Sequence, residues 1–362
     1  MAHRVIQVGT GGFGNHWCRH FLPPNVEDGL VEVVAAVDKS PEALANARDA
    51  LNVPKDRCFT DCRKAFTEVE ADFCTIVVPP AHHEQIVDAA LAAGLNILSE
   101  KPIADTLEAA CRIAEKVRRA GVKMGVTMSH RFRQDITTLR RLVQSGEYGP
   151  LDYLVCRFTC ENRTKPTWGK FRYEIPDPLL VEGSVHHLDL LVDMTGGACE
   201  SLYARTWQPP WGEFAGDAQA MVLMDCADGR RAFYEGAKTN AVGLNGWGSE
   251  YIRAECRDAT FVLQNGRIER FDYDPARKKP QREEGTGTPV PLDEQPKWAN
   301  AWLIEQYCRW LDGGEPMATH VEANLQSMAL IFAAVESSRT GRPVDVQGFL
   351  AGARERATAV MG

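Results

Sequence analysis

Residues 4–14 read Arg-Val-Ile-Gln-Val-Gly-Thr-Gly-Gly-Phe-Gly, and this stretch decides the fold. Its first half has the apolar character of a short buried strand, and its second half matches the pattern GxGxxG. A helix-like segment, residues 15–22, comes next. In this pattern the first glycine permits a tight turn, the second admits a pyrophosphate, and the third allows close packing of helix and strand. The order of strand, glycine turn and helix therefore predicts a dinucleotide site, with the phosphates at the helix N-terminus. The expected contacts are Gly9, Gly11, Gly12, Phe13 and Gly14.

A second apolar strand, residues 31–37, ends at Asp38. The acid lies close to the roughly 20 residues past the glycine turn at which a ribose-binding carboxylate is expected. A carboxylate there accepts hydrogen bonds from the ribose hydroxyls of NAD and repels the 2′-phosphate of NADP. Lys39 leaves NADP as an alternative, because its cationic side chain could bind that phosphate. We expect NAD as the cofactor.

Strands and helices continue to alternate up to residue 127. Residues 72–78 form a continuous apolar run, which is typical of a parallel strand covered on both faces. Further strands are expected at 96–99 and 123–127, and helices at 41–51, 84–93 and 106–120. This alternation predicts a doubly wound parallel sheet, a Rossmann domain comprising residues 1–127.

The pattern changes after about residue 149. Hairpin signals occur at Asp228-Gly229 and Asn265-Gly266. Strands are expected at 152–160, 201–207, 217–226, 230–236, 249–256, 259–263 and 267–273. Two helices, 297–311 and 321–339, are expected to close the chain. We therefore expect an α/β protein whose second domain, residues 128–362, is α+β with an open, largely antiparallel sheet. An alternative for the final helices is that they pack back on the first domain.

Several motifs along the chain resemble those of one family. Glu100-Lys101-Pro102 follows a strand, and residues 182–189 read Glu-Gly-Ser-Val-His-His-Leu-Asp. Further matches are Val78-Pro79-Pro80 with His83, His130-Arg131-Phe132, and residues 337–344. With these motifs the chain resembles the Gfo/Idh/MocA family of nicotinamide-dependent oxidoreductases. Glu182 stands where the family usually has Asp, and His186 matches the family histidine.

The resemblance implies a set of roles for these residues. Lys101 and the pair Glu182 and His186 would surround the reacting carbon. Pro79, His83 and Glu100 would contribute to the cofactor site. The resemblance also implies a homodimer or homotetramer, formed through the outer face of the open sheet.

The residues themselves support acid–base chemistry. Lys101 follows the carboxyl end of a parallel strand, where doubly wound sheets bind ligands, and it could hold the oxygen that loses a proton. If residues 178–194 are helical, Glu182 and His186 at i and i+4 face one side. His186 would then take the hydroxyl proton, and Glu182 would fix its tautomer or bind a second hydroxyl. A metal held by Glu182, His186 and Asp189 is the alternative, but Lys101 already supplies a positive charge, so we expect no metal.

The second half also carries candidates for substrate binding. Sugars stack their C–H faces on tryptophan rings, and arginine binds carboxylates in pairs of hydrogen bonds. Arg131 follows the last strand of the first domain. His187 points about 100° away from His186 on a helix, which also fits packing. The expected substrate contacts are Arg131, Arg163, Trp168 and His187.

Composition excludes several classes of protein. The net charge of −8 argues against nucleic acid as a partner, because phosphate binding needs a basic face. No apolar run approaches the ~18 residues of a membrane span, and the chain begins with a strand pattern rather than a signal peptide. The eleven cysteines include no CxxC pair. We expect reduced thiols and a cytoplasmic location.

The leading prediction is an NAD-dependent oxidoreductase that oxidises a ring hydroxyl of a small carbohydrate: a sugar, a glycoside or a cyclic polyol. One alternative is an NAD-dependent redox glycosidase, which oxidises, eliminates, hydrates and re-reduces, for instance on an anionic glycoside. Another is a non-catalytic dinucleotide sensor. A sensor would need neither Lys101 nor the pair Glu182 and His186, so the sequence favours an enzyme.

Overall fold

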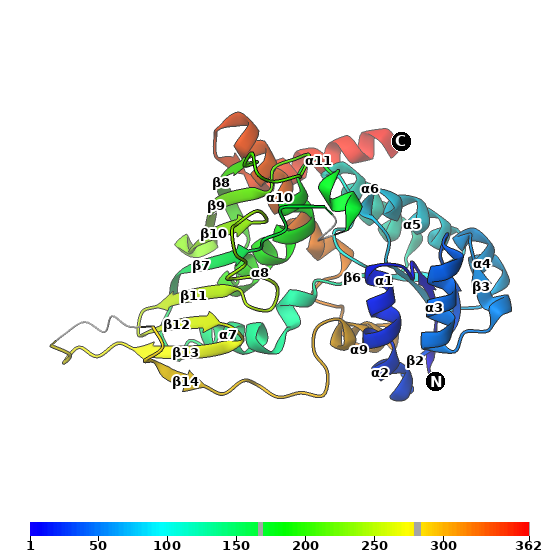
Figure 1. The fold of residues 1–362 in the computed structure, drawn as a ribbon, viewed down its shortest axis with the longest axis horizontal. Coiled ribbons are helices and arrows are strands. Elements are labelled where there is room, and N and C mark those ends of the chain that lie inside the picture. Colours follow the sequence, from blue (N-terminus) through cyan, green and yellow to red (C-terminus); the bar gives the residue numbers. More distant parts are fainter. Residues whose placement is uncertain (166–168, 279–283, 362) are drawn as a thin grey trace. The chain divides into compact units, whose positions relative to one another are not determined.

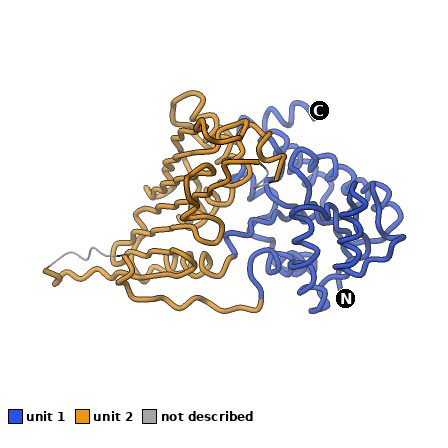
Figure 2. Tube along the Cα trace, in the orientation of Figure 1, with its two compact units in different colours: residues 1–132, 297–328, 351–362 blue, residues 133–296, 329–350 orange. Residues whose placement is uncertain are grey.

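The computed structural model describes residues 1–165, 169–278 and 284–361, and it divides into two compact units (Figure 2). Unit 1 comprises residues 1–132, 297–328 and 351–361. Unit 2 comprises residues 133–296 and 329–350. Unit 1 thus includes two C-terminal stretches in addition to the 127 residues expected from the alternation of strands and helices.

Unit 1 is built on a six-stranded parallel sheet in the order β3-β2-β1-β4-β5-β6, so the expected Rossmann topology is confirmed (Figure 1). The strand order reverses beside β1, whose neighbours are β2 and β4. Ligands bind at such a switch point in open α/β sheets. The strands are β1 (His3–Val8), β2 (Val31–Val37), β3 (Cys58–Phe59), β4 (Phe73–Ile76), β5 (Asn96–Ser99) and β6 (Met124–Val126).

The helices of unit 1 follow the strands in alternation. The helix expected at 15–22 is instead α1 (Phe13–His16) followed by η1 (Trp17–Phe21), a π-helical turn. Pro23 and Pro24 then begin α2 (Pro23–Glu27), because proline needs no amide partner in a first turn. The others are α3 (Pro41–Leu51), α4 (Cys62–Glu68), α5 (His83–Ala92), α6 (Leu107–Ala120) and α9 (Ala299–Leu311).

The core of unit 1 explains why C-terminal residues belong to it. From α9, Ile304 and Tyr307 are fully buried in one cluster with Val5 and Phe73 of the sheet. The rings of Tyr307 and Phe73 lie 5.2 Å apart, edge to face. A helix from far along the chain therefore completes the apolar layer under β1 and β4.

Unit 2 contains a nine-stranded sheet in the order β14-β13-β12-β11-β7-β10-β9-β8-β15. Among the strand pairs of its described residues only β7 and β10 run parallel, which confirms the expected open, largely antiparallel sheet. Its strands are β7 (Leu151–Thr159), β8 (Cys199–Trp207), β9 (Gln219–Cys226), β10 (Arg231–Ala237), β11 (Tyr251–Cys256), β12 (Ala259–Gln264), β13 (Arg267–Asp272), β14 (Thr288–Val290) and β15 (Val344–Asp345).

Two helices of unit 2 pack against this sheet. Helix α7 (Gln134–Gln144) contacts β12 and β13, and α8 (Val185–Thr195) contacts β7 and β10. Residues along β9 alternate between buried and exposed. This alternation is typical of an antiparallel sheet with one covered face.

The chain ends differently from the expectation of two closing helices. Helix α10 (Val321–Thr340) is followed by β15 and then by a third helix, α11 (Val346–Met361). Gly348 and Gly352 lie in α11, and glycine in a helix interior is less favourable than alanine by about 1 kcal/mol. The helix was therefore not predicted from the sequence. No helix in the described ranges is long and apolar enough to cross a membrane.

Candidate active site

The glycine turn after β1 brings backbone groups too close together for any side chain. A Cβ on Gly9 would lie 2.0 Å from the carbonyl oxygen of Val77, and one on Gly14 would lie 2.2 Å from the carbonyl oxygen of Gly9. Gly9 also has a φ of +87°, in the left-handed region that glycine favours. The turn is therefore a cradle of bare backbone at the switch point of the sheet, which fits a pyrophosphate.

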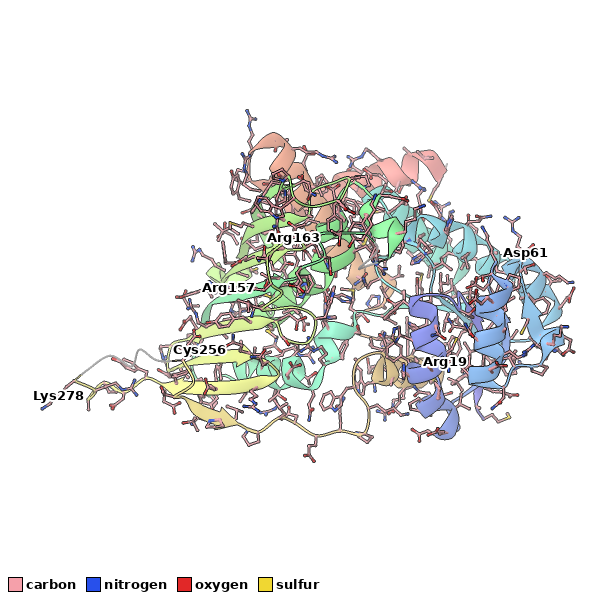
Figure 3. All side chains as sticks on the ribbon, viewed as in Figure 1. Arg19, Asp61, Arg157, Arg163, Cys256 and Lys278 are labelled. Carbon is pink, nitrogen blue, oxygen red and sulfur yellow. The ribbon has the colours of Figure 1, made fainter. Side chains whose placement is uncertain are left out.

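A cavity of about 510 Å³ opens beside this turn, within unit 1. It lies at the carboxyl ends of β1, β2 and β4, and its volume is typical of a ligand site. Asp61, labelled in Figure 3, contributes to its wall. Other lining residues are Gly9, Gly11, Asp38, Lys39, Val78, Pro79, His82 and Gln85. His82 and Gln85 were not predicted, because no motif marks them.

Asp38 is held at the edge of this cavity by backbone amides. Its Oδ2 accepts hydrogen bonds from the amides of Thr10 (2.7 Å) and Gly11 (3.0 Å), and its Oδ1 accepts one from Ser40 (2.9 Å). The carboxylate is thus fixed between the glycine turn and the end of β2. This position fits recognition of a ribose diol.

Glu100 anchors the turn that carries Lys101. Its Oε1 accepts hydrogen bonds from Trp17 Nε1 (2.8 Å) and Asn300 Nδ2 (3.4 Å), and its Oε2 accepts one from the Lys101 amide (3.2 Å). Burial raises the pKa of the Glu100 carboxyl, and Lys101 opposes that rise. Lys101 itself is partly exposed and lies two residues past the end of β5, at the carboxyl edge of the sheet.

His83, expected near the cofactor, is fully buried and lies against protein backbone. Its Nε2 is 2.8 Å from the carbonyl oxygen of Val78, and its Nδ1 is 3.1 Å from that of Ile103. The imidazole therefore joins the segments that follow β4 and β5. Its geometry indicates a supporting role for the cavity wall.

In unit 2, Glu182 and His186 lie in different kinds of helix. Glu182 belongs to η6 (Leu179–Ser184), a π-helical turn, and His186 to the first turn of α8. The expected regular α-helical spacing is therefore interrupted, as often happens at functional sites. Glu182 is buried and accepts a hydrogen bond from Arg172 Nε at 2.9 Å. The ring of His186 is nearly buried and lies edge-on to Trp247, with centroids 6.1 Å apart.

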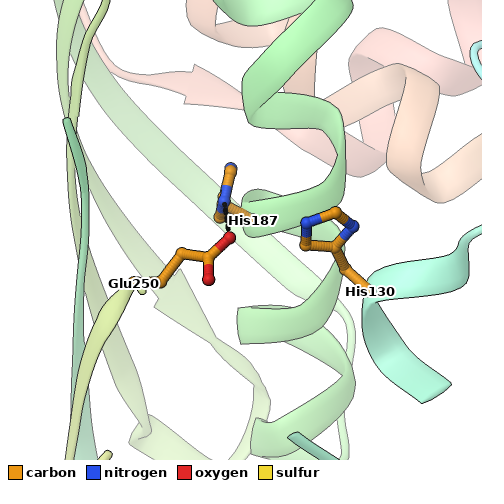
Figure 4. A group of neighbouring side chains, drawn as sticks. All are labelled: His130, His187 and Glu250. Carbon is orange, nitrogen blue, oxygen red and sulfur yellow. Dashed lines mark hydrogen bonds and ion pairs between the residues drawn. The ribbon is translucent and has the colours of Figure 1, made fainter. Parts of the chain in front are cut away.

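His187 is enclosed by aromatic rings on the sheet. It stacks on Phe158 with centroids 4.3 Å apart, and on Tyr234 at 5.6 Å. Its Nε2 lies 3.5 Å from Glu250 Oε1, as the dashed line in Figure 4 marks. These contacts favour a packing role for His187 over direct substrate contact.

The remaining predicted substrate residues lie in different surroundings. Arg163, labelled in Figure 3, donates its Nε–H to the carbonyls of Thr239 (3.0 Å) and Asn240 (3.1 Å). Arg131 lies in η4 (Ser129–Phe132), a short helix of unit 1 after β6. Trp168 lies outside the described residues.

Two buried residues of this region, Lys238 and Glu250, were not singled out from the sequence. Arg172 and Trp247, which contact Glu182 and the two histidines, are among the arginines and tryptophans of the second half that the sequence offered as candidates for substrate binding. Lys238 could have been found, because Ala232, Tyr234 and Gly236 alternate inward along β10 and the next inward position is Lys238. Glu250 needed knowledge of the tertiary contacts.

Comparison with known proteins assigns both halves of the chain. Residues 3–128 match the model of an oxidoreductase family with an NAD-binding Rossmann fold, and residues 136–251 match the model of the GFO/IDH/MocA C-terminal domain. The chain belongs to the Gfo/Idh/MocA family. It is therefore an NAD-binding oxidoreductase, and the resemblance stated from its motifs is confirmed.

Individual relatives differ in how much of the chain they match. The uncharacterized protein y4oX of Sinorhizobium fredii is 53% identical over 97% of both chains. An inositol 2-dehydrogenase of Corynebacterium glutamicum is 30% identical over 55% of this chain and 57% of that protein. An oxidoreductase from Agrobacterium radiobacter, solved with NAD+, L-tartaric acid and magnesium, has a TM-score of 0.80 at 21% identity, covering 96% of this chain and 99% of that one. The last similarity shows the fold alone.

Proposed function

We propose that the protein oxidises a ring hydroxyl of a cyclic polyol, sugar or glycoside, with NAD as the cofactor and Lys101 and His186 as acid–base groups. One observation carries the proposal. The glycine cradle, Asp38 and Lys101 all stand at the carboxyl edge of the same parallel sheet, and Glu100 fixes the Lys101 backbone from the core.

The proposed roles follow from the chemistry of each side chain. Bound NAD would accept a hydride from the substrate carbon. The Lys101 ammonium binds the oxygen of that carbon and stabilises negative charge on it, and His186 takes the hydroxyl proton. Glu182, held by Arg172, binds a second hydroxyl or orients His186. Arg131 remains a proposed substrate contact.

The class of substrate is supported by a relative's name and by the rings of unit 2. The inositol 2-dehydrogenase that matches half of this chain is named for a cyclic polyol. The ring of Trp247 is exposed and lies beside both histidines, and such a ring suits the C–H face of a polyol. Arg163, expected to meet an anionic glycoside, donates instead to protein carbonyls. Dehydrogenation is therefore the reaction that we propose rather than glycoside cleavage.

All eleven cysteines are free thiols, and eight of them are buried. Free thiols are typical of proteins in a reducing compartment. We therefore include a cytoplasmic location in the proposal.

The test follows NADH absorbance and glycoside cleavage together over a panel of inositols, sugars and acidic glycosides. We expect stoichiometric NADH with intact glycosidic bonds. Lys101→Ala should reduce turnover by about 10²–10⁴, because it removes one positioned acid–base group. NAD binding, followed by tryptophan fluorescence, should largely persist, because the glycine turn is on another segment.

The matched control is Lys55→Ala, which removes an exposed lysine of the same unit and should leave the rate unchanged. A Lys101→Ala enzyme with a near-normal rate would exclude this residue from the mechanism. Cleavage of a glycoside without net NADH, accompanied by deuterium exchange at the adjacent carbon, would identify the redox glycosidase instead. An NAD complex inert toward the whole panel would point to the sensor.

A further inference from the structure

The carboxylate of Glu182 forms an ion pair with an arginine from another element of unit 2. Arg172 lies in η5 (Lys170–Tyr173), and its Nε donates to Glu182 Oε2 at 2.9 Å. Glu182 is buried, and Arg172 is partly exposed. Because a buried carboxylate is costly without a partner of opposite charge, the guanidinium helps to hold Glu182 in its ionised form.

Neighbouring residues fix the guanidinium of Arg172 in place. Its central carbon lies 4.5 Å from the ring centroid of Phe171, within the range of a cation–π contact. A Cβ on Gly169 would lie 3.0 Å from Arg172 Nη1, so the glycine leaves room for the guanidinium. The positive charge therefore has a defined place beside Glu182.

His186 lies one turn past Glu182 on the same run of helix. The π-helical turn η6 ends at Ser184, and α8 begins at the next residue. The wider π turn still brings side chains four residues apart onto neighbouring turns. Glu182 and His186 are both buried, and a carboxylate near an imidazole favours the protonated, charged form of the imidazole.

Other charged side chains of unit 2 also lie around His186 and its neighbours. They are Asp189 in α8, Lys238 after β10 and Glu250 before β11. All three are present in every variant of Arg172 or Glu182. A comparison of such variants therefore isolates the effect of the ion pair on His186.

We propose that Arg172 is a positioning residue that offsets the charge of Glu182 and so keeps His186 neutral and able to accept the hydroxyl proton. Only a neutral imidazole has a nitrogen lone pair for that proton. With the negative charge of Glu182 alone beside it, the ring would instead be held as imidazolium. This inference rests on the proposed function and assigns to Arg172 no contact with substrate.

The experiment measures the pH profile of kcat/KM on myo-inositol for four variants. Arg172→Met removes the positive charge beside the carboxylate, so the midpoint of the acidic limb should rise by about one pH unit. Glu182→Gln removes the negative charge and keeps the guanidinium, so the midpoint should fall. The double variant should return close to the wild type, and Arg172→Lys, which keeps the charge, should stay there.

NMR spectroscopy of protein labelled with ¹⁵N-histidine gives a second readout that needs no catalysis. The His186→Gln variant identifies the His186 signals, whose titration midpoint should follow the same order among the variants. Arg257→Met is the matched control, because it removes an exposed guanidinium of the same unit that is paired with Asp258. It should move neither midpoint.

The outcomes separate a charge effect from a structural one. Unchanged midpoints in Arg172→Met overturn the inference even if Tm falls, and so do equal shifts in Arg172→Met and Arg257→Met. If Arg172→Met does not fold, Glu182→Gln decides: a lower midpoint supports the inference, and an unchanged one overturns it.

A further outcome separates the inference from the proposed function. A wild-type enzyme that is inactive on every sugar and polyol overturns the proposed oxidation. NMR midpoints in the expected order would then still support the balance of charge at His186, whereas unchanged NMR midpoints would overturn that as well.

Discussion

At the scale of single residues, we expect Asp38 to decide the choice of cofactor. Its carboxylate is fixed by the amides of Thr10, Gly11 and Ser40, so it cannot easily turn away from a ligand in the cavity. The described residues that line the cavity include two carboxylates, Asp38 and Asp61, and one lysine, Lys39. A 2′-phosphate brought to this edge would meet like charge.

We therefore predict that NAD binds at least about tenfold more tightly than NADP, since like charges at close range cost more than 1.4 kcal/mol. Titration of both cofactors by tryptophan fluorescence measures the ratio. Lys39→Ala should leave the preference for NAD in place. Tighter binding of NADP, abolished in Lys39→Ala, would show that the lysine and not the aspartate sets the specificity.

Single residues also show where sequence patterns lose information. The glycine pattern predicts a turn that no side chain can enter, and the backbone contacts of Gly9 and Gly14 have this property. The surroundings of His83 and Arg163 depend on carbonyls of Ile103 and Thr239, which are 20 and 76 residues away along the chain. No local pattern specifies such partners, so neither side chain could be recognised as occupied by protein contacts.

At the scale of elements, Glu100 ties the end of β5 to η1 and α9. It is buried among them, and burial raises the pKa of its carboxyl above the ordinary value of 4.5. The folded chain therefore binds this proton more tightly than the unfolded chain does. As pH rises from about 4.5 through the raised pKa, the free energy of unfolding should fall, because the buried carboxyl must ionise.

Glu100→Gln should remove this slope. Urea unfolding between pH 4.5 and 8 measures the free energy of unfolding of the wild type and of the variant. The advantage of the wild type over the variant should shrink, or reverse in favour of the variant, as pH rises. Glu115 is the matched control, because Arg118 and Arg119 lower the pKa of its carboxyl to about 2. Its contribution is lost only below about pH 4.5, so Glu115→Gln should give a constant difference over the same range. A constant difference for Glu100→Gln as well would contradict the prediction.

The elements themselves were predicted where strong local signals mark their ends. Helix α3 begins at Pro41 after the capping Ser40, whose hydroxyl accepts the Ala43 amide at 3.2 Å, and it ends at the predicted residue. The π-helical turns η1 and η6 were missed, because apolar spacing does not distinguish an extra residue in one turn from a regular helix. The altered spacing of Glu182 and His186 could therefore not be predicted.

At the scale of the whole molecule, the uncovered face of the sheet in unit 2 carries an apolar row. Tyr203, Leu223, Phe233 and Val155 are register partners on four neighbouring strands. The exposed fraction of Leu223 is 47%, and those of Tyr203 and Phe233 are 37% and 36%. A contiguous apolar row on an otherwise alternating sheet marks a surface for association.

We predict that a second copy of the chain covers this row and that the protein is a homodimer or homotetramer. A two-fold axis can pair such a row with itself, because the same patch serves both subunits. Leu223→Arg places a charge at its centre and should lower the mass measured by light scattering after size exclusion, with NAD binding by unit 1 retained. Val360→Arg, which adds the same charge at an exposed apolar position of α11, should leave the mass unchanged. A wild-type protein that is monomeric at micromolar concentration would exclude the subunit contact. A Leu223→Arg variant with the mass of an oligomeric wild type would place the contact elsewhere.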